Sequence, residues 1–233
     1  GASAPSTRSA AGGAQPLRRL RRGVRRGRAG PRAGSGGAVR ITLDVGHAGK
    51  ATSPADRGAV YKGREEVAVA VAYILAADRH LRELGHEVLL FPGLGSYGER
   101  IQRAAVAGAD VYVQAHLDAG LGGRTGDRGM AVHDHRSARG AALAADVAQA
   151  LGEALPWPVF ARAARPDDDD EARDEDLSEA YSCIAAAYAL RPVGLLLEVG
   201  FLDGLLGATW LPANPEAVGR AIAEGIDAWA RSR

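Results

Sequence analysis

Short apolar segments alternate with longer amphipathic segments from residue 39 to the end of the chain. The first apolar segment, residues 39–45, is rich in β-branched side chains and ends at Gly46 and His47. This pattern predicts a buried strand with functional groups at its carboxyl end. Residues 65–84 contain neither glycine nor proline and stop at Gly85, which is typical of a helix with a glycine after its last turn.

The same alternation continues along the rest of the chain. Further strands are predicted over residues 86–91, 110–115, 130–133 and 193–198, and further helices over 99–107, 138–154, 177–190 and 215–231. Strands that alternate with helices of this length are typical of parallel sheets whose two faces are covered by helices. We therefore expect an α/β fold, with a single domain and a mostly parallel central sheet that has helices on both faces.

The N-terminal segment has a different composition. Residues 1–38 are rich in arginine, glycine and alanine, hold almost no large apolar side chain and contain no carboxylate. Such a segment cannot bury enough apolar surface to offset the entropy of ordering. We predict a disordered arm over 1–38 and one folded domain over 39–233. We interpret the arm as a solvated linker that is dispensable for chemistry, although an electrostatic contact with an anionic polymer stays open.

Composition also restricts the kinds of site that the chain can build. Cys183 is the only cysteine, so neither an intramolecular disulfide nor a cysteine-rich zinc site is available. No apolar run reaches the roughly 18–20 residues of a membrane span, and no signal-peptide core is visible. The acidic run over 167–176 lacks the glycine and the ligand spacing of an EF-hand, which favours a solvated loop. Any metal must be held by histidine, aspartate or glutamate.

Four polar residues stand where predicted elements begin or end. His47 and His116 follow two predicted strands, and Glu66 lies in the first turn of the first predicted helix. Two imidazoles and one carboxylate form a common catalytic zinc site with a fourth position for water, whose pKa zinc lowers to roughly 7. Glu198 follows the apolar run 194–197, where a carboxylate is costly unless it has a function.

Each of these residues lies inside a longer motif. Residues 41–49 read ITLDVGHAG, 56–59 DRGA, 63–66 GREE, 110–118 DVYVQAHLD, 129–132 GMAV and 197–202 LEVGFL. In this order they resemble motifs of the type-3 zinc N-acetylmuramoyl-L-alanine amidases, the family of cell-wall amidases and lysins. The resemblance extends over residues 39–231, and the stretch around Glu198 is its most specific part.

Several positions depart from the family pattern. Ala48 stands in a glycine slot, Gln114 in a serine slot and Asp118 in an asparagine slot, and Asp203 and Gly204 replace the usual Ser-Asn pair. These departures affect contacts with the substrate more than they affect the metal site.

Membership of that family implies a hydrolase that cleaves the amide bond between N-acetylmuramic acid and L-alanine in peptidoglycan. One Zn²⁺ per chain would be bound by His47, Glu66 and His116, with Glu65 as the alternative second ligand. Glu198 would be the catalytic carboxylate that accepts a proton from water and delivers it to the leaving nitrogen. Residues 39–233 would then be the catalytic domain of a monomer that acts in the cell envelope, periplasmic or extracellular, with peptidoglycan and no specific nucleic acid as its partner.

Two other functions stay open on the sequence alone. One is another zinc hydrolase of similar fold that cleaves the stem peptides of peptidoglycan, and the other is a non-catalytic wall-binding module. The four intact site residues argue against the module. Among the remaining conspicuous side chains, we interpret His86 as a surface group, His133 and His135 as a solvent-exposed pair, and Arg191 as either a ligand of a peptide carboxylate or a partner in a structural ion pair.

Overall fold

A computed structural model of the chain describes residues 37–48, 56–91, 95–164, 184 and 187–233. The predicted arm lies outside these residues except for its last two positions. Cys183, the acidic run and most of the predicted helix over 177–190 also lie outside them. Among the described residues, no helix is both long enough and apolar enough to cross a membrane.

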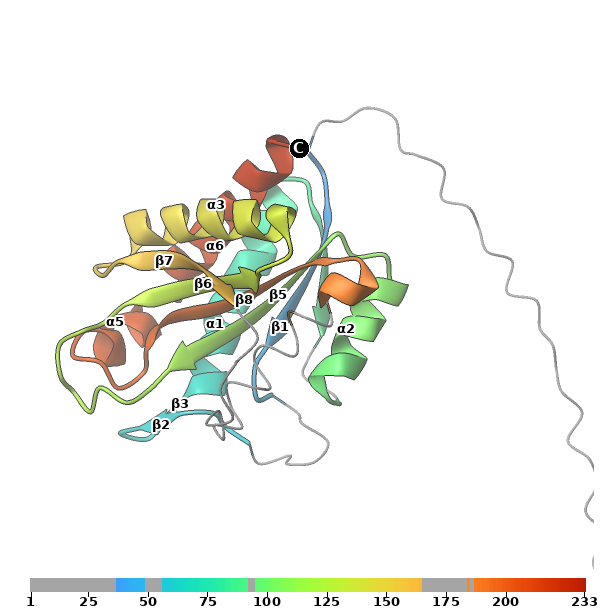
Figure 1. Cartoon of the computed structure of the whole chain (residues 1–233). Helices are drawn as coiled ribbons and strands as arrows, with labels where there is room; N and C mark the ends of the chain where they lie inside the picture. Colours follow the sequence, from blue (N-terminus) through green and yellow to red (C-terminus); the bar gives the residue numbers. More distant parts are fainter. Residues whose placement is uncertain (1–36, 49–55, 92–94, 165–183, 185–186) are drawn as a thin grey trace, which may run out of the picture. The chain divides into compact units, whose positions relative to one another are not determined.

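Six strands form the central sheet, in the order β4-β1-β5-β8-β6-β7 (Figure 1). They are β1 (Arg40–Val45), β4 (Glu87–Phe91), β5 (Val111–Asp118), β6 (Gly129–Asp134), β7 (Val159–Ala164) and β8 (Val193–Phe201). Strands β4, β1, β5 and β8 run parallel to one another, whereas β6 is antiparallel to β8 and parallel to β7. The predicted mostly parallel sheet is confirmed, and its direction reverses between β8 and β6.

Helices cover both faces of this sheet, as predicted. On one face, α6 (Pro215–Arg231) packs against both α1 (Glu66–Glu83) and α3 (Ala138–Ala154), over the larger apolar core. On the other face, α2 (Tyr97–Val106) packs over β1 and β5 and contributes to a smaller core with Tyr112 and Leu196.

Local sequence explains where these helices begin and end. The side chains of Ser96 and Glu99 form a reciprocal capping box at the start of α2, which satisfies two of the free N–H groups there. Gly85 follows α1 with a φ of 90°, a conformation that glycine adopts without strain. Helices α3 and α6 have the predicted bounds, but β5 and β8 run past His116 and Glu198, so both residues lie within strands.

The sequence interpretation of two histidines was wrong. His86 is buried and accepts a hydrogen bond from the Val39 N–H, while its Nε2 lies 3.2 Å from the Asp227 carboxylate. His133 is also buried, with its Nδ1 2.9 Å from the Asp134 carbonyl oxygen. His86 precedes β4 and is buried against α6, which carries Asp227, whereas His133 of β6 is buried against the start of α3. His135 is exposed, as predicted.

Candidate metal centre and active site

His47 stands at the carboxyl end of β1 in a left-handed backbone conformation, with a φ of 60°. Its backbone N–H donates to the Tyr97 hydroxyl at 3.2 Å, and its Nδ1 lies 3.1 Å from an oxygen of Asp56. The preceding glycine is required by packing, because a Cβ at Gly46 would lie 1.9 Å from the His116 ring. The GH pair of the sequence motif therefore brings two imidazoles together.

Glu66 is the first residue of α1, and both of its carboxylate oxygens accept hydrogen bonds. The backbone N–H of Ala59 donates to Oε2 at 2.8 Å and that of Leu117 to Oε1 at 3.0 Å. Burial raises its pKa, but the hydrogen bond from His116 and the charges of both histidines outweigh burial and hold the pKa below its ordinary value. Glu66 is therefore a buried carboxylate that is ionised.

The short motif over 56–59 supports this carboxylate. Asp56 orients the His47 ring, and the Ala59 N–H donates to Glu66. Gly58 lies between them with a φ of 65°, and a Cβ there would come within 2.3 Å of Glu66 Oε2. Sequence reasoning recognised this motif only by its resemblance to the family, and it did not predict that Asp56 contacts His47.

His116 completes the group from its place in β5. Its Nδ1 lies 3.1 Å from Glu66 Oε1, and its ring centroid is 5.1 Å from that of His47. Nitrogen or oxygen atoms of His47, Glu66 and His116 lie within 4.8 Å of one another, an arrangement that could hold a metal ion. The alternative ligand, Glu65, points elsewhere and pairs with Arg57 at 3.1 Å.

The buried Nε2 atom of His116 has no hydrogen-bond partner among the described residues. A buried polar atom without a partner costs free energy comparable to a lost hydrogen bond. Because Nδ1 already faces a carboxylate, which can only accept, the ring proton belongs on Nδ1 and Nε2 carries a free lone pair. A metal ion would satisfy this lone pair, so the residues present fit a metal.

Glu198 lies directly beside His116, since the two residues are paired in the register of β8 with β5. Its Oε2 atom is buried and has no hydrogen-bond partner within the described parts of the chain. Burial raises its pKa well above the ordinary value, and the negative charges of Glu66 and Asp118 raise it further. The pKa of Asp118 is also raised, mainly by burial.

The site therefore gathers negative charge. Glu66, Glu198 and Asp118 come from three different elements, and the described residues show no lysine or arginine in an ion pair with Glu66 or Glu198. Neighbouring carboxylates repel one another where no lysine or arginine neutralises them, and a bound divalent cation offsets this repulsion. The gathered carboxylates and the His116 Nε2 atom, which has no partner among the described residues, both favour a bound cation at this site.

Residues 41–228 match the family described as N-acetylmuramoyl-L-alanine amidase. The chain belongs to this family. It is therefore an amidase that hydrolyses peptidoglycan, as the motifs predicted, and the matched range contains the four candidate residues. Among curated protein sequences, none matches the chain.

Several solved structures share the fold of this amidase at low sequence identity. CwlD from Clostridioides difficile, solved in complex with the GerS lipoprotein, is 18% identical with a TM-score of 0.64, over 84% of this chain and 100% of that chain. Ami1 from Mycobacterium smegmatis is 16% identical with a TM-score of 0.64, over 85% and 100% of the two chains. Cwp6 from Clostridium difficile is 20% identical with a TM-score of 0.64, and the match covers 82% of this chain but only 29% of Cwp6.

Proposed function

We propose that this amidase uses one Zn²⁺ per chain, bound by His47, Glu66 and His116, and that Glu198 is its catalytic carboxylate. The observation that carries the proposal is a pair of buried atoms on neighbouring strands, His116 Nε2 and Glu198 Oε2, neither of which has a hydrogen-bond partner among the described residues. One of them is suited to bind a metal and the other to take a proton. The amide bond cleaved would be that between N-acetylmuramic acid and L-alanine.

The donor set favours zinc over other common divalent cations. Two imidazole nitrogens and one carboxylate are typical of catalytic zinc sites, whereas Ca²⁺ and Mg²⁺ prefer sites made of oxygen atoms alone. When bound, zinc supplies a Lewis acid and lowers the pKa of water to roughly 7. Glu66 contributes the negative charge that such a site needs, because its pKa is held below the ordinary value.

The protein itself prepares the histidines for this role. The Asp56 carboxylate faces Nδ1 of His47, and Glu66 faces Nδ1 of His116. Since a carboxylate only accepts hydrogen bonds, the Asp56 carboxylate keeps the proton of His47 on Nδ1 and leaves Nε2, which lies 3.7 Å from Glu66 Oε2, free as a ligand. The hydrogen bond from the Tyr73 hydroxyl to the His116 carbonyl oxygen, at 3.0 Å, further fixes β5 at this point.

Glu198 would move the proton in the reaction. Its Oε2 atom accepts a proton from the attacking water and later delivers it to the nitrogen of L-alanine, so that the C–N bond breaks with a neutral amine as leaving group. The raised pKa suits a group that must both accept and donate near neutral pH. Positioned acid–base groups of this kind contribute about 10²–10⁴-fold to the rate.

The substrate implies the place of action. Because peptidoglycan lies outside the cytoplasm, we propose that the enzyme acts in the cell envelope, in the periplasm or outside the cell, and that it works as a monomer. Cleavage within the stem peptide stays the alternative reaction, since a zinc site alone does not select which amide bond is cut.

Digestion of purified peptidoglycan tests the proposal. The zinc-loaded enzyme is expected to release intact stem peptides with a free L-alanine amino terminus, measured by mass spectrometry. Chelation should abolish this release and added Zn²⁺ should restore it. Peptides cut at an internal position would replace the proposed bond by one in the stem peptide, and unchanged turnover after complete metal removal would contradict the zinc site.

A further inference from the structure

Helix α2 reaches the turn that carries the candidate metal ligand His47. Its Tyr97 and Arg100 side chains are three residues apart, so they lie on the same face of the helix. Both are buried, and the Arg100 guanidinium lies 5.1 Å from the centroid of the Tyr97 ring. The capping box of Ser96 and Glu99 begins the helix at Tyr97, which fixes the place of both side chains along it.

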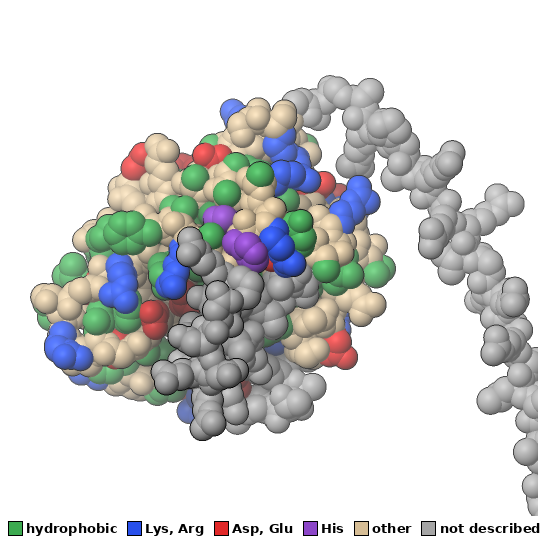
Figure 2. All heavy atoms as spheres, viewed as in Figure 1, with side chains coloured by type: hydrophobic (Ala, Val, Ile, Leu, Met, Phe, Trp, Pro, Cys, Tyr) green, Lys and Arg blue, Asp and Glu red, His purple; other side chains and the backbone are tan. Residues whose placement is uncertain are grey.

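Arg100 is buried to a degree that is unusual for an arginine, because it is 0% exposed. Most lysine and arginine side chains lie at the surface of a protein, and Figure 2 shows several of them on one face of this molecule. A buried guanidinium is costly unless acceptors match its N–H groups and its charge. The acceptors of Arg100 therefore indicate what this side chain does.

Arg100 bonds to the main chain on both sides of His47. Its Nη1 atom donates to the Val45 carbonyl oxygen at 3.1 Å and to the Asp44 carboxylate at 3.3 Å. Its Nη2 atom donates to the Ala48 carbonyl oxygen. Because the N–H groups of a guanidinium form a planar fork of fixed geometry, these bonds fix the two carbonyl groups relative to each other.

Tyr97 holds the peptide group of His47 itself. The N–H of His47 donates to the Tyr97 hydroxyl at 3.2 Å. The N–H of Ala48 donates back to the Gly46 carbonyl oxygen at 2.6 Å, which closes a tight turn around His47. Hydrogen bonds thus engage the main chain before, at and after this ligand.

This turn places His47 in a conformation that residues with a side chain rarely adopt. Its φ is 60°, and such a conformation persists at a non-glycine residue only where the surrounding structure over-determines it. The backbone conformation also sets the direction of the side chain. In this one, His47 Nε2 lies 3.7 Å from Glu66 Oε2, and the His47 ring centroid lies 5.1 Å from that of His116.

We propose that Tyr97 and Arg100 are positioning residues that hold His47 in the left-handed conformation needed for metal binding. Both side chains bond to the main chain of residues 45–48, so they act on the metal only through His47. The inference rests on the proposed metal centre. It gives α2 a role in preparing a ligand that stands about 50 residues earlier in the chain.

A purely structural role for Arg100 would be to neutralise the buried Asp44 carboxylate. That role requires a positive charge, whereas the positioning role requires donors that reach two carbonyl groups at once. Lysine carries the charge at a single point and lacks the planar fork of donors. Arg100→Lys therefore distinguishes the two roles.

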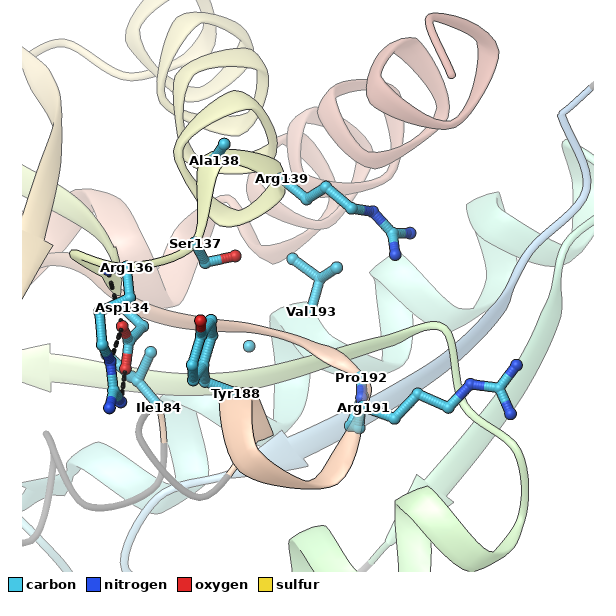
Figure 3. Close-up of a pocket in the computed structure, with 11 residues that line it drawn as sticks. Asp134, Arg136, Ser137, Ala138, Arg139, Ile184, Tyr188, Arg191, Pro192 and Val193 are labelled. Atoms are coloured by element: carbon cyan, nitrogen blue, oxygen red, sulfur yellow. Dashed lines mark hydrogen bonds and ion pairs between the residues drawn. The ribbon is translucent and has the colours of Figure 1, made fainter.

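Arg136 has partners of the same kinds away from the metal centre. It donates from Nε and Nη2 to Asp134 at 2.8 and 2.6 Å, and its guanidinium lies 4.4 Å from the centroid of the Tyr188 ring (Figure 3). Because β6 runs antiparallel to β8, its last residue, Asp134, lies toward the start of β8 and away from Glu198. Arg136→Lys is therefore a matched control that does not involve residues 45–48.

Competition titration of the full chain with Zn²⁺ measures the effect. Arg100→Lys and Tyr97→Phe should each weaken zinc binding by about tenfold, as when a group that orients a metal ligand is removed, and Arg136→Lys should not. Tyr112→Phe is the second control, since its hydroxyl donates to a carboxylate instead. A dissociation constant within about twofold of the unmodified protein, less than one hydrogen bond contributes, would overturn the role of that residue, as would an equal loss in its control.

The conformation of His47 provides a test that does not depend on zinc. A crystal structure of metal-free Arg100→Lys is expected to show His47 with a φ outside the left-handed region, and an unchanged φ would overturn the proposal. Failure of the unmodified chain to bind Zn²⁺ would instead contradict the proposed metal centre. The φ of His47 in the variant would then still show whether Arg100 holds this turn.

Discussion

Two clusters of buried charge lie on the same face of the sheet, and they differ in how completely their polar atoms are paired. One cluster joins Asp44 of β1, Arg100 of α2 and Tyr112 of β5, all fully buried. Arg100 donates to Asp44, to the Val45 carbonyl oxygen at 3.1 Å and to the Gly95 carbonyl oxygen at 3.0 Å. The Tyr112 hydroxyl donates to the same carboxylate.

The second cluster is the candidate metal centre, whose His116 lies four residues beyond Tyr112 along β5. Here His116 Nε2 and Glu198 Oε2 are buried without a partner among the described residues. Thr42, Gln114 and Arg40 each hold one such atom as well, but none of these is a carboxylate beside a histidine. A paired cluster acts as scaffold, whereas an incomplete cluster of ligand atoms indicates a place for a bound group.

The largest expected effect is the loss of the metal itself. His116→Ala removes the ring whose Nε2 atom lacks a partner, so both zinc and turnover should be lost, measured by metal analysis and by release of stem peptides. His133→Ala is the matched control, since His133 is also buried, in β6 of the same sheet, and its Nδ1 faces a carbonyl oxygen instead of a carboxylate. Full zinc occupancy in the His116 variant would show that the centre lies elsewhere.

The next effect concerns the paired cluster and should appear as lost stability. Arg100→Met leaves Asp44 buried without its cation, which typically costs about 3–5 kcal/mol, measured by denaturant unfolding. Arg57→Met is the control, because the Arg57–Glu65 pair is exposed and such pairs contribute about 0–1 kcal/mol. A loss below about 1 kcal/mol in the Arg100 variant would mean that the Arg100–Asp44 pair does not stabilise the fold.

Glu198→Gln should lower turnover without loss of bound zinc. The amide keeps the shape of the side chain but cannot accept the proton, so turnover should fall by about 10²-fold or more while zinc stays bound. Steady-state kinetics and metal analysis of the same preparation provide the measurement. A change of less than about tenfold in a folded, zinc-loaded variant would exclude Glu198 as the proton acceptor and direct attention to Asp118 or Asp56.

Much of the fold could be predicted because its signals are local. The apolar run before His47, the capped start of α2 and the glycine after α1 each depend on a few consecutive residues. Strand β7 was not predicted, because Phe160, Ala161 and Arg162 are exposed at the sheet edge and show no apolar alternation. The antiparallel pairing of β6 was not predicted either, since strand direction depends on contacts between distant segments.

The candidate site was predicted by motif, but its physical organisation was not. The sequence placed His47, Glu66, His116 and Glu198 at element ends, and the structure brings them together. The roles of Asp56 and Arg100 could not be inferred, because each acts through contacts with residues that are distant in sequence. The burial of His133 likewise follows from the position of α3 over the sheet.

The smallest expected effect is a gain in stability on mutation of a catalytic residue, because the charged Glu198 carboxylate should destabilise the metal-free protein. The pKa of Glu198 is raised in the folded state above its ordinary value of 4.5, chiefly by burial. Its contribution to stability is therefore fully present below pH 4.5 and is lost as the pH rises through the elevated folded pKa. Replacement of Glu198 by glutamine, which cannot ionise, should therefore abolish this loss of stability at high pH.

Metal-free Glu198→Gln is accordingly expected to melt at a higher temperature than the metal-free parent at pH 8, with the difference shrinking toward pH 5. Glu66→Gln supplies the opposite sign, because the pKa of Glu66 is lowered in the folded state. Its contribution is present above its ordinary pKa and is lost as the pH falls through the folded value, so this variant should melt below the parent at pH 8. Thermal melts of the three metal-free proteins across this range decide the matter, and a Glu198→Gln difference that does not vary with pH would mean that the carboxylate is not under electrostatic strain.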